Sequence, residues 1–218
     1  MPKANALSKE RPLSRSEHKR LAILEAAAEV FLQHGFLGTS MDEVAARAEV
    51  SKQTVYKQFA SKEALFIEIV QSMTDTASGR VQSDMRDPHD MEQLAAELLA
   101  YAERQLTIVM TPRLMQLRRV VIGEAGRFPE LGKALYDGGP GRAIKGLAAA
   151  FTRWADRGLL VVDKPSVAAE QFNWLVMGEA INRAMLLGDQ GSPGPAALRR
   201  HAAAAVRVFL AAYGSRGA

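Results

Sequence analysis

The stretch VSKQTVYKQFASKEALF, residues 50–66, decides how the rest of the chain is interpreted. At about 100° per residue, Val55 and Phe59 fall on one side of a helix, and Gln53 and Lys57 fall on the opposite side. Helices of fewer than ~12 residues are marginal in water by themselves. We therefore expect Val55 and Phe59 to anchor this short helix against neighbouring elements, with its polar side left exposed.

The residues before this stretch predict a longer helix. The sequence EHKRLAILEAAAEVFLQHG places Leu21, Leu24, Ala28 and Phe31 on one apolar stripe. Gly35 is expected to end that helix, because glycine adopts the left-handed conformation found at helix C-termini. A long helix of this kind gives the short polar helix something to pack against.

Serine residues predict the starts of the helices that follow. Ser40 opens a capping box with Glu43, Ser51 caps the polar helix, and Ser61 caps a longer helix that begins KEALFIEIV. The predicted order is a long helix, a short helix, a tight turn, a second short helix and a long exit helix. Two short helices around a tight turn are typical of the helix-turn-helix motif.

The polar side of the second short helix has the chemistry of a DNA major-groove reader. Glutamine can pair with adenine, lysine with guanine, and the threonine methyl group can contact thymine, which suits Gln53, Lys57 and Thr54. Tyr56 and Lys62 are long enough to reach phosphate oxygens, and Lys62 lies at a helix start that favours anions. A solvated helix face is the alternative interpretation.

Taken in order, these blocks resemble the amino-terminal domain of TetR-family transcriptional regulators over roughly residues 17–70. The resemblance rests on the first-helix pattern and on the blocks GFLGTS, VAARAEVS, TVYKQF and SKEAL. It implies DNA contacts at Thr39, Met41, Lys52, Gln53, Thr54, Tyr56, Lys57 and Lys62. It also implies that Val55 and Phe59 are structural.

Two positions depart from the family pattern. Glu49 stands in the turn where the family often has glycine, and Gln53 stands where glycine is also frequent. A positive φ at Glu49 would cost about 1 kcal/mol, which the surrounding packing can offset. Gln53 adds a possible base reader, so the preferred operator sequence does not follow from the resemblance.

Composition excludes several classes of protein. The chain has 218 residues, 48% of them hydrophobic, which is enough to fill a core and argues against global disorder. It has no cysteine, which excludes disulfides, thiolate nucleophiles and thiolate metal ligands. No window approaches the ~20 continuous apolar residues of a membrane span, and no signal-peptide pattern is present. We expect a cytoplasmic protein that does not bind a membrane.

Positive charge is concentrated near the amino terminus. Residues 1–20 contain six basic and two acidic side chains, a net charge of +4 that equals the formal charge of the whole chain. A basic arm on a neutral body is typical of a phosphate-seeking tail, although a solubilising disordered terminus has the same composition. We interpret residues 1–15 as a flexible basic arm.

The rest of the chain also predicts helices. They are expected at about 91–109, 113–127 and 142–157, over 167–188 after a Ser166 cap, and in SPGPAALRRHAAAAVRVFLAAYG. Gly138, Gly139, Pro140 and Gly141 indicate a turn, and LLVV is too short to make a sheet. The segments GEAGRFPELGKALYDGG and FTRWADRGLLVVDKP resemble the carboxy-terminal domain of AefR-like TetR regulators.

The expected fold is therefore all-α. Residues 16–75 would form a three-helix helix-turn-helix DNA-binding domain, and residues 76–218 a larger helical domain for effector binding and dimerisation. The segment 167–187 is apolar nearly all round, and the last helix has small residues next to large ones, which suits a four-helix bundle between two copies. The residues assigned to that contact are Ala202, Ala205, Ala212 and Gly214 beside Val206, Phe209 and Tyr213. Burial of both helices inside one protomer is the alternative.

Large adaptable side chains in the second domain suggest a pocket for a small apolar effector. The candidates are Met110, Leu114, Met115, Phe151, Trp154, Phe172 and Met177. Gln171, Asn173 and Glu179 could orient a ligand, although Glu179 could equally pair with Arg183. Plain core packing is the alternative for each apolar candidate. The resemblance implies a homodimeric repressor of a palindromic double-stranded operator, which the effector releases.

Catalysis is not indicated. His18, His34, His89 and His201 are far apart in sequence, and DPHD at residues 87–90 is the only local cluster that could suggest a metal. No phosphate loop or nucleophile elbow is present, so neither a cofactor nor a metal is expected. The alternatives to an operator-specific regulator are a sequence-neutral DNA-packaging protein and, last, an α-helical metal-dependent enzyme.

Overall fold

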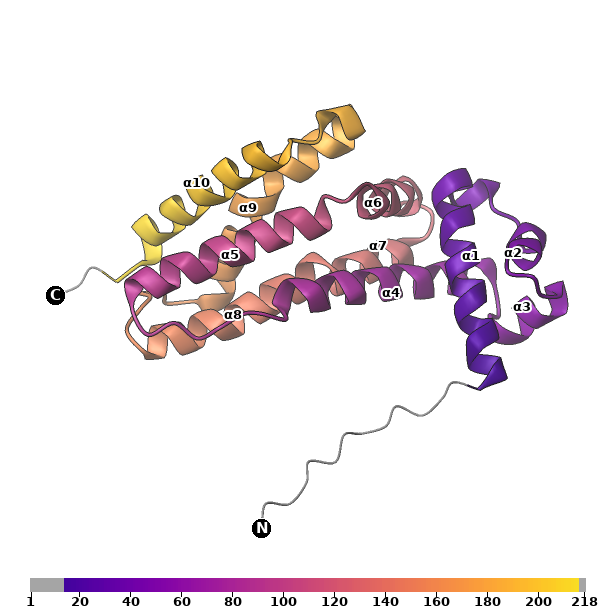
Figure 1. The fold of residues 1–218 in the computed structure, drawn as a ribbon, viewed down its shortest axis with the longest axis horizontal. Coiled ribbons are helices and arrows are strands. Elements are labelled where there is room, and N and C mark those ends of the chain that lie inside the picture. The colour runs from indigo at the N-terminus through magenta and orange to yellow at the C-terminus, as the bar shows by residue number, and fades with distance from the viewer. Residues whose placement is uncertain (1–13, 216–218) are drawn as a thin grey trace, which may run out of the picture. The chain divides into compact units, whose positions relative to one another are not determined.

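The computed structural model describes residues 14–215, so the expected arm falls almost entirely outside the described residues. The helices in chain order are α1 (Arg15–Gly38), α2 (Met41–Arg47), α3 (Lys52–Gln58), α4 (Lys62–Gln82), α5 (Met91–Val109), α6 (Pro112–Glu124), α7 (Pro129–Gly138), α8 (Pro140–Asp156), α9 (Pro165–Leu187), the 3-10 turn η1 (Asp189–Gly191) and α10 (Pro195–Tyr213) (Figure 1). No strand occurs between residues 14 and 215, so the expected all-α fold is confirmed. The chain divides into two compact units between Phe66 and Ile67, earlier within α4 than the expected boundary between residues 75 and 76.

Three phenylalanine rings form the centre of the first unit. The Phe31 and Phe66 centroids lie 4.5 Å apart, and Phe36 lies 5.9 Å from Phe31 and 5.6 Å from Phe66. All three side chains are buried, together with Val44 of α2 and Val55 of α3. Aromatic pairs at these separations add to the stabilisation from buried area, so this cluster holds the short helices in place.

The predicted apolar stripe of α1 is partly wrong. Leu21 is 52% exposed, whereas Ile23, Ala27 and Val30 are fully buried beside Phe31. The alanine-rich sequence leaves the phase of the stripe ambiguous, because alanine contributes little apolar area on either face. The packing of α1 on α2 selects the face that carries Ile23 and Val30.

The predicted helix signals around α2 and α3 are present. Gly35 has φ of 73° and interrupts α1, and the hydroxyls of Ser40, Ser51 and Ser61 accept hydrogen bonds from the third backbone N–H after each. The capping box at Ser40 is only half formed, since the Glu43 carboxylate lies 3.1 Å from His34 Nε2 instead. These caps satisfy N–H groups that short helices would otherwise leave without partners.

Glu49 adopts the left-handed conformation that the sequence suggests for the turn. Its φ is 54°, and it is the one non-glycine residue between 14 and 215 with a positive φ. Backbone hydrogen bonds from Glu49 N–H to Ala46 and from Val50 N–H to Ala45 hold the turn. These bonds and the packing of Val44 and Val55 offset a conformational cost of about 1 kcal/mol.

The second unit is a helical bundle around a second aromatic cluster. The Phe151 and Phe209 centroids lie 5.0 Å apart, and Phe172 lies 6.0 Å from Phe151 and 4.9 Å from Phe209. Helix α9 packs on α8 and on α10, and α10 packs on α5. Each of these elements contributes a fully buried apolar face to one contiguous core.

Several helix starts in this unit differ from those predicted. Helix α7 was not predicted, α8 begins at Pro140 where a turn was expected, and α9 begins at Pro165 with Lys164 rather than Ser166 as its N-cap. Every helix from α6 to α10 begins with proline. Proline is favoured at the first helical position because its fixed φ suits the helix and its missing N–H would have no partner there.

The end of the described chain is fastened to the loop between α8 and α9. Leu160 and Gly214 form an isolated antiparallel bridge. The backbone N–H of Val161 donates to Tyr213 O at 2.8 Å, and the N–H of Ser215 donates to Leu159 O at 3.1 Å. We call this contact the carboxy-terminal clasp.

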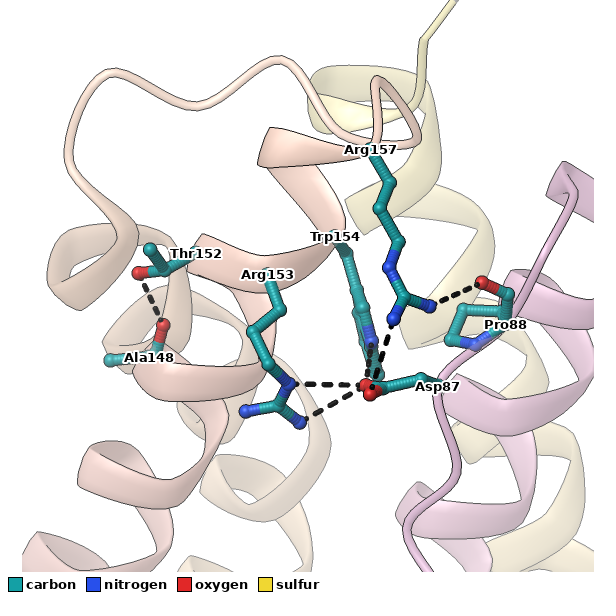
Figure 2. Close-up of polar contacts among 7 residues, drawn as sticks. All are labelled: Asp87, Pro88, Ala148, Thr152, Arg153, Trp154 and Arg157. Atoms are coloured by element: carbon teal, nitrogen blue, oxygen red, sulfur yellow. Dashed lines mark hydrogen bonds and ion pairs between the residues drawn. The ribbon is translucent and has the colours of Figure 1, made fainter.

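Asp87 fastens the segment between α4 and α5 onto α8 (Figure 2). Its Oδ1 accepts hydrogen bonds of 3.1 Å from Arg153 Nε and from the indole N–H of the buried Trp154, and Arg157 lies 3.6 Å from its Oδ2. Arg153, followed by Trp154, lowers the pKa of the Asp87 carboxyl below its ordinary value. The DPHD segment thus has a structural explanation, and no cluster of metal-binding side chains occurs among the described residues.

Replacing Asp87 by alanine is expected to lower the free energy of unfolding by about 1–2 kcal/mol at pH 7, because the buried Trp154 N–H loses its acceptor. A carboxyl whose pKa is lowered by folding stabilises the protein above its unfolded pKa of about 3.9, and this contribution is lost as pH falls through the lower folded pKa. Urea unfolding of the wild type and of Asp87→Ala should therefore show a difference in the free energy of unfolding that becomes smaller below about pH 4. Asp84→Ala, at an exposed position in the same segment, is the control. A difference that stays constant down to pH 3 would contradict the role of the carboxylate.

Helix α1 is long and apolar enough, by length and composition, to cross a membrane. Core helices of globular proteins pass the same test. Ile23, Val30 and Phe31 are fully buried within the first unit, so the core of that unit accounts for the apolar character of α1.

Candidate functional site

Helix α3 has one buried side and one exposed side, as its sequence predicts. Val55 is fully buried and Phe59, which follows the helix as its C-cap, is 3% exposed. Gln53 and Lys57 are exposed, and Tyr56 is 47% exposed. Together with the half-buried Thr54 they line a shallow hollow on the surface. The exposed side therefore offers amide, ammonium and phenol groups on one short helix.

Contacts with α1 fix the C-terminal end of α3. The Arg20 guanidinium donates to Gln58 O at 2.9 Å and lies 4.4 Å from the Phe59 ring centroid. The Gln58 side-chain amide donates to Ser16 Oγ at 3.0 Å. Because the helix is tied at this end and anchored by Val55 in the middle, its exposed side is presented in one orientation.

Lys52 at the start of α3 is paired with α2. Its ammonium lies 2.8 Å from Asp42 Oδ1, and both side chains are more than half exposed. The hydrogen bond that Lys52 donates to Asp42, followed by the charge of Asp42, raises the pKa of Lys52, so the ammonium stays protonated. An exposed pair of this kind contributes little stability and can open, which leaves Lys52 available to another anion.

Three residues that were expected to contact DNA have other surroundings. Thr39 is 3% exposed and its hydroxyl donates to Gly35 O at 2.7 Å, and Met41 is 6% exposed. The Lys62 ammonium donates to Phe36 O at 2.9 Å and to Thr39 O at 3.1 Å. These two carbonyl groups use two of the three N–H groups of the Lys62 ammonium. DNA contacts by Thr39, Met41 and Lys62 stay predictions, and the proposal below is argued from the exposed residues of α3.

A cavity lies within the second unit among residues of α4, α5, α6, α7, α8 and α9. The cavity volume is about 60 Å³, and one side is open to solvent. Most of the wall is apolar, with Val81, Met115, Met177 and Ile181 among the lining residues. Drug-sized ligands occupy cavities of ~300–1,000 Å³, so this cavity would have to widen to enclose a small organic molecule.

The structure divides the residues that were expected to form an effector pocket. Leu114, Met115 and Met177 line the cavity, whereas Met110 lines a separate surface groove beside Pro112 and Leu198. Phe151, Trp154 and Phe172 belong to the packed core and do not line the cavity. Their large side chains pack against one another, which is the plain-core alternative.

The polar lining includes residues that the sequence reasoning missed. Of the three polar candidates, Asn173 lines the cavity, and Gln171 and Glu179 are exposed elsewhere. Gln105 and Arg118 also line it and were not predicted. The signal for Arg118 lies in LMQLRRVV, where a charged residue continues the apolar face of Leu114 and Val121 at helical spacing.

The comparisons with known proteins identify the family. Residues 23–69 match the family described as bacterial regulatory proteins, tetR family, and residues 96–215 match the AefR-like transcriptional repressor C-terminal domain. The second match alone spans more than half of the chain. The chain belongs to the TetR family. It is a transcriptional regulator with a DNA-binding helix-turn-helix, in a family of regulators rather than enzymes.

Solved structures of TetR-family proteins are similar over nearly the whole chain. A TetR-family transcriptional regulator from Mesorhizobium loti is 35% identical, with a TM-score of 0.83 over 93% of this chain and 100% of that one. The Flavonoid-responsive Regulator FrrA is 32% identical, with a TM-score of 0.75 over 91% of this chain and 98% of that one.

Curated TetR-family relatives match over shorter segments. The transcriptional activator FasR from Mycolicibacterium smegmatis is 36% identical over 77 residues, 35% of each chain. The regulator RutR from Escherichia coli is 44% identical over 57 residues, 26% of this chain and 27% of RutR. The chain thus matches about a third or less of the length of these two relatives.

Helices α9 and α10 of this TetR-family protein carry exposed apolar side chains. They are Val167, Trp174, Leu175, Leu186 and Leu187 on α9 and Val208 on α10. Four residues that were expected to face a second copy, Ala202, Ala205, Val206 and Phe209, are instead buried within the protomer. The small side chains among them let α10 pack closely on α5 and α9, and the large ones fill the core between these helices.

Proposed function

We propose that this TetR-family protein is a ligand-responsive repressor that binds a palindromic operator as a homodimer. The observation that carries the proposal is the exposed side of α3, with Gln53, Tyr56 and Lys57 held outward by the buried Val55. Gln53 and Lys57 would read base edges in the major groove, and Tyr56 would bind phosphate. Thr54 and Lys52 would contribute at the edge of the same surface.

A homodimer is proposed from the exposed apolar side chains of α9 and α10. Trp174, Leu175 and Val208 are each at least 38% exposed. Several large apolar residues exposed on two neighbouring helices are typical of an interface between copies. Two-fold symmetry would let two recognition helices read half-sites separated by about one or more DNA turns.

Effector control is proposed from the cavity in the second unit. Helix α4 contributes Ala77, Ser78 and Val81 to the cavity lining, and the same helix begins at Lys62 in the DNA-binding unit. A ligand that prefers one of two conformations by about 100-fold supplies ~2.7 kcal/mol toward that conformation, enough to change operator occupancy. The name of the relative FrrA makes a flavonoid-sized effector a reasonable probe.

Repression is proposed because the matched carboxy-terminal family is described as a repressor domain. The relative FasR is named as an activator, but it matches only 35% of the chain. A cytoplasmic location is proposed because an operator-binding regulator acts where the DNA is, and the fold of the family is consistent with it.

The proposal is tested by selecting bound duplexes from a random pool with the full-length protein. We expect a palindromic sequence, and affinity for it about 10³-fold or more above that for a scrambled duplex. Gln53→Ala should flatten the base preference at one position in each half-site, whereas Gln71→Ala, at an exposed position of α4, should leave it unchanged. A pool without an enriched palindrome, and equal affinity and salt dependence for all duplexes, would favour sequence-neutral DNA packaging instead.

A further inference from the structure

The cavity in the second unit has an unusual distribution of charge. Arg118 is the one charged side chain among its lining residues, which include no aspartate or glutamate. No hydrogen bond or ion pair joins Arg118 to another residue between 14 and 215. Its neighbour Arg119, in contrast, donates to Ala184 O at 2.9 Å. The cavity therefore combines apolar walls with one unpaired guanidinium.

The surroundings of Arg118 disfavour an unpaired charge. The side chain is half-buried, and burial lowers the pKa of the guanidinium. Arginine nevertheless stays protonated in proteins, so the charge remains in the cavity wall. A partly desolvated cation without a partner is destabilising, and an anion that entered the cavity would relieve this cost.

A second polar group in the wall is also incompletely satisfied. Gln105 Nε2 donates to Asn173 Oδ1 at 2.8 Å, and both side chains are at least 97% buried. Gln105 Oε1 and Asn173 Nδ2 have no partner among the described residues. This amide pair offers one free acceptor and one free donor, and exchanging the oxygen and nitrogen positions of both amides preserves that count.

Three other polar side chains of the lining have partners within the protein. Ser78 donates to Gly138 O at 2.6 Å, Thr74 donates to Val70 O at 2.8 Å, and Gln82 donates to Arg142 O at 3.4 Å. The polar side-chain groups in the lining that are left to bind a ligand are therefore Arg118, the Gln105–Asn173 pair and the indole N–H of the partly exposed Trp174.

We propose that the cavity binds an amphipathic organic acid whose carboxylate pairs with Arg118. The apolar body of the ligand contacts Met115, Met177 and the other aliphatic lining residues, and a further polar group bonds the Gln105–Asn173 amides. Arginine matches carboxylate geometry with two parallel hydrogen bonds, and such charge-assisted bonds are about twice as strong as neutral ones. The inference rests on the proposed effector function and narrows the apolar effector that the sequence suggested to one with an acidic group.

A second copy of the chain is the competing source of an anion. Trp174 lines the cavity and is also 40% exposed on α9, the helix proposed to contact another protomer. An acidic side chain of a second copy that entered the open side would pair with Arg118 in place of a ligand. A test of ligand binding must therefore also measure whether each variant is a monomer or a dimer.

The test uses the full chain and two matched pairs of probes, 2-naphthoate with 2-naphthamide and octanoate with octanamide, measured by titration calorimetry. We expect each acid to bind the wild type about tenfold or more tightly than its amide. Arg118→Met should bring the acid-to-amide ratio close to one, and Arg118→Lys should keep part of it. Arg113→Met, at an exposed arginine of the same helix, should keep all of it.

Several results would overturn the proposal. These are equal affinities of acid and amide for the wild type, an acid preference that survives in Arg118→Met, and no binding by either acid. A change from dimer to monomer in Arg118→Met, measured by light scattering, would assign the guanidinium to a subunit contact instead. Thermal melting checks that each variant is folded. If Arg118→Met is not folded, the acid-to-amide affinity ratio of Arg118→Lys is compared with that of the wild type instead.

Operator binding separates this inference from the function it rests on. Release of the selected palindrome by a neutral compound, with no acid preference, would contradict the acid proposal alone. Failure of the random pool to yield a palindrome, with the acid preference intact, would contradict the proposed function and leave the ligand class standing.

Discussion

Replacing Phe66 by alanine is expected to lower the free energy of unfolding of the DNA-binding unit by about 3–5 kcal/mol. The Phe66 ring is fully buried, with its centroid 4.5 Å from that of Phe31 and 5.6 Å from that of Phe36. The substitution removes the ring and leaves a cavity where three aromatic side chains meet. Small units have a net stability of only ~5–15 kcal/mol, so this loss is a large fraction of the total.

Urea unfolding of the full chain, followed by far-ultraviolet circular dichroism, measures this effect. Phe66→Leu should retain part of the stability, and Leu37→Ala, at a side chain 62% exposed in the same unit, should change it by less than about 0.5 kcal/mol. A loss below 1 kcal/mol in Phe66→Ala would show that the three rings are not the centre of this unit.

Replacing Lys57 by glutamate is expected to weaken binding to the selected operator by about 100-fold or more. Lys57 is exposed on α3, so the substitution removes a cation and places an anion on the surface proposed to enter the groove. A factor of 100 corresponds to ~2.7 kcal/mol, within reach of one lost contact plus repulsion from phosphate charge. The salt dependence of binding should become shallower, because fewer counterions are released.

The matched control is Lys145→Glu, at an exposed lysine of α8 in the second unit. It changes the net charge by the same amount but should leave operator affinity within a few-fold of wild type. Fluorescence anisotropy of the labelled duplex at two or more salt concentrations measures both variants. Equal effects of the two substitutions would mean that net charge, rather than the α3 surface, determines affinity, and the recognition role of Lys57 would be abandoned.

Local signals in the sequence were enough to predict the DNA-binding unit. The opposition of Val55 and Phe59 to Gln53 and Lys57 follows from helical spacing alone, and both sides are placed as expected. Serine caps and Gly35 act on the residues next to them, so their effect could also be predicted. Lys62 shows the limit of this approach, because its length suits a phosphate, but spacing alone does not predict that its ammonium donates to two nearby carbonyls.

Features that depend on distant residues could not be predicted in the same way. The cavity brings together residues from Thr74 to Ile181, and nothing in the local pattern says which of them converge. Large side chains such as Phe151 and Trp154 have the size that suits a ligand pocket, but their rings pack in the core. The case for Arg118 as a ligand-binding residue depends on its neighbours in the cavity, which are mostly apolar and include no acidic side chain.

The carboxy-terminal clasp has a practical consequence for anyone who labels or fuses this protein. Backbone atoms of Tyr213, Gly214 and Ser215 complete the hydrogen bonding of the loop that joins α8 to α9. Cutting the chain before these residues would remove the backbone groups that hydrogen-bond to that loop. A purification tag or fluorophore attached at that terminus therefore needs a spacer that begins after Ser215.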